Sequence, residues 1–172
     1  MIQIRDETPA DRERVFAIHA AAFAQPNEAK LVDALRASAH PHLSLVAEVE
    51  GTVVGHVFFS SVSIESAPHA PTAAGLAPVA VDPLHQGRGI GSALIRAGLK
   101  RCPQIGWRAI FLVGDPAYYA RFGFVRATPL GFTYGNAHFD AALQVIELNR
   151  GALTGCRGRV CFHPAFAETG TG

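Results

Sequence analysis

Apolar and polar residues recur along the chain with two different periods, and each change of period marks a new element. Apolar residues at helical spacing over residues 15–23 predict a helix, and Thr8 and Pro9 suit its cap and first turn. Apolar runs on both sides of Glu50-Gly51 predict a β-hairpin. The predicted elements, in chain order, are strand 2–5, a helix to about 24, a helix capped by Asn27 that ends before 40, strands 43–49, 52–64 and 76–81, helix 90–101, strand 109–113, helix 117–122, extended chain at 124–125, and strand 142–148.

The order of these elements predicts a mixed α/β (α+β) sheet, because helices and strands do not alternate regularly enough for a doubly wound one. Proline-rich residues 66–75 predict a surface loop, and Cys102-Pro103 is expected to end helix 90–101. No repeat or change in composition marks a boundary. Residues 1–172 are therefore predicted to form a single domain, with a tail at about 151–172 that packs on it or extends from it and has a loose end.

Composition narrows the class of protein. Hydrophobic residues make up 49% of the chain and charged ones 17%, which favours a compact globule. A net charge of +1 indicates neither a nucleic-acid partner nor an anionic membrane, and no apolar run approaches the ~20 residues that span a bilayer. Three cysteines without CxxC spacing predict reduced thiols and a cytoplasmic protein. The histidines are dispersed, so no metal site is predicted.

A glycine-rich segment carries the clearest chemical signal. Residues 79–91 predict a buried strand, a short turn and a loop that runs directly into a helix. The first amides of a helix have no partner inside it, and they lie at the positive end of its dipole, so this junction suits an anion, phosphate above all. Gly87, Gly89 and Gly91 allow positive φ and a close approach of the backbone, and Arg88 can pair with phosphate oxygens.

Spacing separates the known phosphate loops. A Walker loop needs a Lys-Ser or Lys-Thr pair, which is missing here. A Rossmann unit needs a different glycine interval and an acid about 20 residues on, and residues 105–111 contain no carboxylate. Gln86-Gly87-Arg88-Gly89-Ile90-Gly91 instead resembles the pyrophosphate loop of GNAT-type N-acetyltransferases, Gln/Arg-x-x-Gly-x-Gly/Ala. A glycine-rich turn without a ligand is the alternative interpretation.

A second motif stands about thirty residues further on. Residues 112–124 resemble the other GNAT signature, a buried strand followed by a helix that ends Tyr-x-x-x-Gly-Phe, here Tyr119 to Phe124. The resemblance implies a GNAT-like acyl-CoA N-acyltransferase fold, with a central, mostly antiparallel sheet that splays at the coenzyme site between flanking helices. The coenzyme-binding positions that it implies are Val79, Ala80, Val81, Gln86, Gly87, Arg88, Gly89, Ile90, Gly91, Ser92, Asp115 and Tyr119.

The same resemblance implies an activity. It predicts a transferase that passes an acetyl group from acetyl-CoA to an amine by direct attack, with no metal, the amine belonging to a small molecule or a protein. Tyr119 would protonate the leaving thiolate or donate a hydrogen bond to its sulfur; a packed helix aromatic is the alternative. Residues 114–124 and 163–166 further resemble a branch of predicted bacterial N-acetyltransferases, whose acceptors are mostly unassigned. A monomer or a homodimer fits this branch.

The general base is the open question. Many GNAT members place a Glu on the strand before the glycine loop, and residues 76–81 contain no acid. The candidates are Glu28 at the start of the second helix and His56 in mid-strand, with Glu48 on the neighbouring strand; each also fits a purely structural role. The missing acid supports an alternative function, a CoA- or acyl-CoA-binding sensor or regulatory module without turnover.

Overall fold

The computed structural model describes residues 1–65 and 67–172, and it contains two compact units. Unit 1 comprises Met1–Ser60, Ala77–Arg101 and His163–Gly172, and unit 2 comprises Ser61–Leu76 and Cys102–Phe162. Each unit is described by itself below. The expectation of one domain over 1–172 stays a prediction.

The sheet of unit 1 begins with three antiparallel strands. β1 (Ile2–Asp6) pairs with β2 (His42–Val49), which pairs with β3 (Thr52–Ile64). The predicted hairpin is confirmed: both residues of its turn, Glu50 and Gly51, have positive φ, at 50° and 78°. Leu45 and Val57 face each other across the hairpin, and both are buried.

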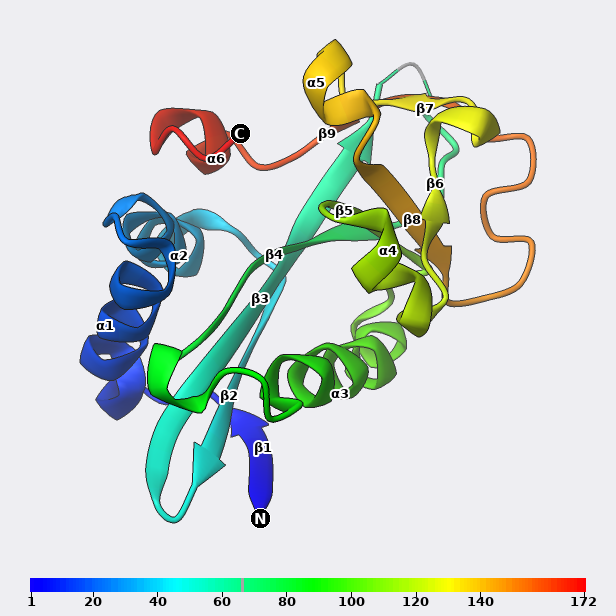
Figure 1. Cartoon of the computed structure of the whole chain (residues 1–172). Coiled ribbons are helices and arrows are strands. Elements are labelled where there is room, and N and C mark those ends of the chain that lie inside the picture. The colour runs from blue at the N-terminus through cyan, green and yellow to red at the C-terminus, as the bar shows by residue number, and fades with distance from the viewer. Residues whose placement is uncertain (66) are drawn as a thin grey trace. The chain divides into compact units, whose positions relative to one another are not determined.

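Two helices of unit 1 lie side by side next to β3 (Figure 1): α1 (Arg12–Phe23) and α2 (Asn27–Ser38). A 3-10 turn, Pro9–Asp11, precedes α1, and the Asp11 carboxylate accepts hydrogen bonds from the backbone and side chain of Thr8. Asn27 was expected to cap α2, but it is the first helical residue and its side chain donates to Thr169 O at 3.1 Å. The C-terminal residues are thus anchored, where a loose end was expected. A short helix there, α6 (Ala165–Glu168), buries Phe166.

Helix α3 (Ile90–Ile105) is longer than the sequence predicts. Pro103 does not end it at Arg101, because a proline in the last turn removes only one backbone donor; the chain leaves the helix at Gly106, where φ is +107°. The helix packs closely on β3 through a small residue. A Cβ at Gly98 would lie 2.3 Å from the Phe59 ring, so only glycine fits there without movement of that ring.

Unit 2 contains the strands that surround β5 (Ala109–Val113). β5 pairs in parallel with β4 (Ala73–Val81) and antiparallel with β8 (Leu143–Glu147), which also pairs with β6 (Val125–Arg126). The predicted loop 66–75 is too long, because β4 already starts at Ala73; Ser66 itself lies outside the described residues. The parallel ladder joins Ala73–Gly75 to Ala109–Phe111, at the start of β4.

The core of unit 2 is rich in aromatic side chains. Phe111 and Phe132 are buried with ring centroids 5.2 Å apart in an edge-to-face contact, which is favourable for aromatic pairs. The remaining elements of the unit are α4 (Pro116–Tyr119), the 3-10 turns Ala120–Phe122 and Thr128–Leu130, β7 (Phe132–Thr133), α5 (Ala137–Asp140) and β9 (Gly158–Cys161).

These elements confirm the predicted fold class. The fold is mixed α/β, with a mostly antiparallel sheet that splays along β4 and is flanked by helices. Among the described residues, no helix combines the length and the apolar character needed to cross a bilayer.

Candidate functional site

The glycine-rich loop of unit 1 connects β4 to α3 (Figure 1). A 3-10 turn, Pro83–His85, follows β4, and the chain then enters the helix at Ile90. Gly87 and Gly89 have φ of +74° and +78°, and nothing lies within 4 Å of a Cβ built on either of them. Both glycines are therefore required by the backbone conformation, and the space beside them is open. Gly91, by contrast, is an ordinary helical residue in the first turn of α3.

The start of α3 offers backbone donors. Ala93 N–H donates to the carbonyl oxygen of Gly89, the residue just before α3, at 3.0 Å. The amides of Ile90 and Gly91 precede it and point out of the helix end, where the dipole is positive. Arg88 is exposed in the loop just before them. The junction can therefore bind an anion through its backbone and one guanidinium.

Asp82 holds this loop in place. Its N–H donates to Val54 O at 2.8 Å, and its carboxylate accepts from Leu84 N–H at 2.9 Å and from the guanidinium of Arg14. Arg14 also donates to Val53 O at 2.9 Å, so α1, β3 and the loop meet at one carboxylate. The bond from Leu84 N–H, followed by the pairing with Arg14, keeps the pKa of Asp82 below its usual value. The sequence marks Asp82 only as the end of a strand, and no local pattern points to Arg14.

The end of β4 presents main-chain groups to the same region. Gln86 donates from Nε2 to Val81 O at 3.0 Å, so its side chain braces the loop against the strand. Pro78 has no N–H, which leaves Val79, Ala80 and Val81 as the backbone donors at this end of β4. Ala80 is buried, and Val79 and Val81 are half-buried.

Unit 2 holds the second motif. Asp115 accepts from Ala117 N–H at 3.0 Å and caps α4, so its carboxylate serves the helix start. Tyr119 is at the end of α4, with its ring 5.9 Å from that of Phe124. A Cβ at Gly114 would lie 2.5 Å from the Tyr119 ring, so that glycine makes room for the tyrosine. Burial, with the neighbouring Tyr118, raises the pKa of Tyr119 to about 12, and the phenol is neutral at physiological pH.

The three base candidates have different surroundings, all in unit 1. Glu28, at the start of α2, accepts from Gln25 at 3.1 Å through both oxygens. Glu48 accepts from the guanidinium of Arg5 at 3.0 Å, which is a structural ion pair. His56 is fully buried, and its Nδ1 lies 2.8 Å from Nε2 of His19, a residue that the sequence analysis did not select.

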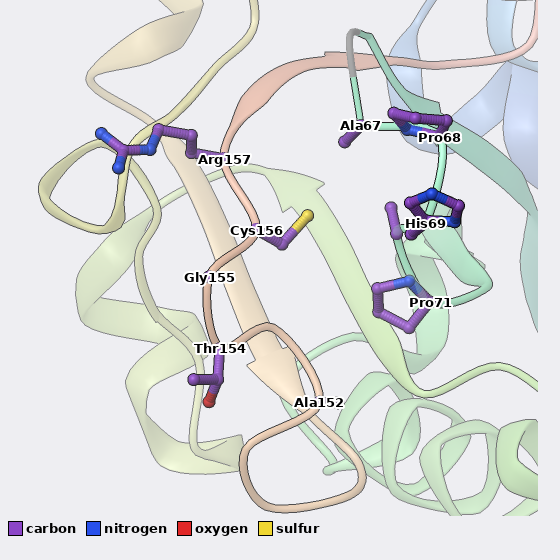
Figure 2. A pocket seen from close by; sticks show the side chains of 10 residues that line it. Ala67, Pro68, His69, Pro71, Ala152, Thr154, Gly155, Cys156 and Arg157 are labelled. Carbon is purple, nitrogen blue, oxygen red and sulfur yellow. The ribbon is translucent and has the colours of Figure 1, made fainter.

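A cavity of about 350 Å³ lies in unit 2 (Figure 2), and neither motif contributes to its lining. It is lined by residues 67–71, 152 and 154–157. Figure 2 shows the Cys156 sulfur directed into the space between these segments, and burial raises the pKa of this thiol. It is therefore a poor nucleophile at neutral pH. Among the described residues, no group of three or more His, Cys, Asp or Glu side chains is placed to hold a metal ion.

Comparisons with known proteins agree with this geometry. A family model described as an acetyltransferase (GNAT) domain matches residues 3–127. The chain is 37% identical over 164 residues to the uncharacterized N-acetyltransferase YhbS of Escherichia coli K12, which covers 95% of this chain and 97% of YhbS. The crystal structure of E. coli YhbS in complex with CoA superimposes with a TM-score of 0.89 at 36% identity, over 96% of this chain and 92% of that one. A GNAT family acetyltransferase from Brucella melitensis in complex with acetyl-CoA gives a TM-score of 0.77 at 38% identity, over 96% and 98%.

We expect Asp82→Ala to lower the free energy of unfolding by about 1 kcal/mol at pH 7, since it removes a capping carboxylate. The folded state depresses the pKa of Asp82, so its contribution is complete above the unfolded-state value of about 3.9 and is lost as pH falls through the folded value. Urea unfolding at pH 7 and pH 3 measures the difference. Glu13→Ala, at an exposed position of α1, is the control and should change little. A difference between Asp82→Ala and wild type that does not shrink at pH 3 would contradict the assigned ionisation.

Proposed function

The chain belongs to the acetyltransferase (GNAT) family, and on that premise we propose that it transfers an acetyl group from acetyl-CoA to an amine by direct attack. The observation that carries the proposal is the loop Gln86–Gly91, in which two left-handed glycines lead into amides that have no partner inside the helix they begin. The resemblance of two motifs and of the whole fold to proteins solved with CoA and acetyl-CoA supports it. We assign the reaction to the cytoplasm, as expected for a protein whose described cysteines are free thiols.

In this proposal the loop binds the pyrophosphate of the coenzyme. The phosphate oxygens face the amides of Ile90 and Gly91 and the guanidinium of Arg88. The rest of the pyrophosphate site is formed by Gly87, Gly89 and Ser92. Main-chain groups of Val79, Ala80 and Val81 hold the pantetheine arm, and one of their N–H groups polarises the thioester carbonyl. Because Pro78 lacks a donor, that polarising N–H comes from the last three residues of β4.

Tyr119 serves the leaving group. A free thiol has a pKa of about 8.5 and burial raises the pKa of Tyr119 to about 12, so full proton transfer to the thiolate is uphill by about 5 kcal/mol. A hydrogen bond from the neutral phenol to the departing sulfur is therefore favoured over complete transfer before the C–S bond breaks. The sulfur then collects its proton as the product is released.

The alternative function is a CoA-binding sensor without turnover, which the absence of an acid from residues 76–81 supports. We expect acetyl-CoA incubated with a panel of small amines and lysine peptides to release free thiol in proportion to the reactive amine. Micromolar CoA binding without amine-dependent release would instead establish the sensor. No heat of binding at millimolar CoA would overturn both.

Gly89→Val should weaken CoA binding at least tenfold, because a β-branched residue strains a backbone with φ of +78° and moves the amides out of line. Gly51→Val is the matched control: Gly51 also has φ of +78° and open space beside it, but it lies in the β2–β3 turn. Both variants should lose about 1–2 kcal/mol of stability. Calorimetry should show reduced affinity for CoA in Gly89→Val alone. Equal affinity for CoA in the two variants would show that the loop does not bind the coenzyme.

Tyr119→Phe should lower kcat by about 10²-fold and leave the Kd for CoA within twofold, since it removes a donor to the leaving sulfur and keeps the ring. Tyr118→Phe, one residue earlier on α4, makes the same chemical change and should retain kcat. Thiol-release kinetics with acetyl-CoA and the best amine provide the measurement. A Tyr119→Phe variant as active as Tyr118→Phe would show that the Tyr119 hydroxyl has no part in the reaction.

A further inference from the structure

Four polar side chains from four separate segments form a continuous hydrogen-bonded chain inside unit 1. Glu7 follows β1, His19 is on α1, Ser44 is on β2 and His56 is on β3. Ser44 Oγ lies 2.6 Å from Glu7 Oε2 and 2.8 Å from His56 Nε2, and His56 Nδ1 lies 2.8 Å from His19 Nε2. Both histidines are completely buried, and the Glu7 side chain is only 6% exposed.

The carboxylate at one end determines the direction of every hydrogen bond. Glu7 is paired with Arg36 at 2.6 Å, so as a carboxylate it can only accept, and Ser44 must donate to it. The Ser44 oxygen therefore accepts from His56 Nε2–H. Burial lowers the pKa of His56 to about 3 and that of His19 to about 2, so both rings are neutral and carry one proton each. His56 Nδ1 is then an acceptor, and His19 Nε2–H donates to it.

This assignment leaves one nitrogen bare. His19 Nδ1 is a buried acceptor with no hydrogen-bond partner among the described residues. Buried acceptors are almost always paired in folded proteins, so this nitrogen is available to accept a hydrogen bond from a bound donor such as a substrate N–H. The Phe23 ring stacks on His19 with centroids 6.0 Å apart, and Phe23 is 39% exposed, so a ring that reaches the surface covers one face of His19.

The hydrogen-bonded chain includes a residue of β3 that neighbours β4, the strand proposed to hold the thioester. A Cβ at Gly55 would lie 3.0 Å from Ile90 and Leu94 of α3 and 3.4 Å from Ala80 O of β4. Successive residues of a strand point to opposite faces, and His56 accordingly points away from α3, towards α1. His19 and His56 therefore lie on the α1 face of the sheet, and Gly55, the neighbour of His56, adjoins Ala80 near the end of β4.

We propose that His19 Nδ1 accepts the proton of the attacking amine and that His56, Ser44 and Glu7 carry that proton away, an inference that rests on the proposed acetyl transfer. As the amine nitrogen bonds to the acetyl carbon and the C–S bond breaks, an N–H proton moves to His19 Nδ1. Proton shifts from His19 Nε2 to His56 Nδ1, from His56 Nε2 to Ser44 Oγ and from Ser44 to Glu7 follow. Both rings end neutral in their other tautomer, Glu7 ends as a carboxylic acid, and the thiolate takes its proton from Tyr119 or water.

The tautomers of His19 and His56 test the relay, and they can be measured without assaying enzyme activity. Long-range ¹H–¹⁵N correlation spectra of the ¹⁵N-histidine-labelled protein at pH 7 should show His19 and His56 each protonated at Nε2 and bare at Nδ1. His19→Gln and His56→Gln variants assign the signals. Protonation of His19 at Nδ1, or a charged ring at either position, would overturn the proposal.

Kinetics test its role. His19→Gln keeps a donor for His56 but cannot pass a proton on, and it should lower kcat at least 10²-fold with the Kd for CoA unchanged. His42→Gln is the matched control: His42 is on β2 but is not part of the hydrogen-bonded chain, and the variant should keep kcat within twofold. Ser44→Ala should lower kcat about tenfold and Ser44→Thr should restore it, because threonine retains the hydroxyl. Restoration distinguishes a relay from mere packing.

The outcomes separate this inference from the proposed function. A wild-type protein that binds acetyl-CoA but releases no thiol with any amine refutes the transfer and the relay together. A wild-type protein that turns over while His19→Gln keeps its kcat within twofold refutes the relay alone. Equal loss in Ser44→Ala and Ser44→Thr also refutes it, since the hydroxyl would then carry no proton.

Discussion

The loop between β4 and α3 has to expose its own backbone donors, and the rest of the site depends on that constraint. Amides that point out of a helix end are costly unless something accepts from them, and the turn that presents them needs left-handed φ at Gly87 and Gly89. The Asp82 carboxylate stabilises the turn from one side through Leu84 N–H and from the other through Arg14. A buried strand, a helix and a carboxylate thus hold an exposed loop in one conformation, as a binding site built from backbone requires.

The parts of the site that were predictable are local in sequence. Gln86 to Gly91 and Tyr119 to Phe124 are each six consecutive residues, so the sequence displays both motifs directly, and their resemblance to GNAT signatures implies the chemistry. Arg14 and His19 could not be found in this way, because their partners Asp82 and His56 are 68 and 37 residues away and neither has a distinctive neighbour. Errors at element ends have similar causes. Pro103 fits within the last turn of α3, and Asn27 uses its amide to anchor Thr169 instead of capping α2.

The polar side chains of unit 1 are stabilised in two different ways, depending on how close they lie to solvent. Charged groups near its surface form ion pairs, such as Arg5 with Asp11 and Glu48, where solvent reduces both the cost and the gain. Deeper in the unit the polar groups are neutral imidazoles, because an isolated charge there would lose its hydration without adequate return. Burial lowers the pKa of both histidines, as this argument requires. Glu7, at the end of the histidine network, accepts hydrogen bonds from Arg36 at both of its oxygens.

This arrangement bears on the order of proton movements during transfer. A phenol with a pKa of about 12 is a weak acid towards a thiolate, so in the proposed transfer Tyr119 would stabilise the leaving group but would do little to drive the reaction. The driving step must then be removal of the amine proton, which turns an attacking ammonium-like nitrogen into a stable amide. A strand without an acid cannot supply that base from residues 76–81. A neutral imidazole pair that shifts its tautomer towards Glu7 can do so without placing a lasting positive charge in the buried interior, and the β4 acid is then unnecessary.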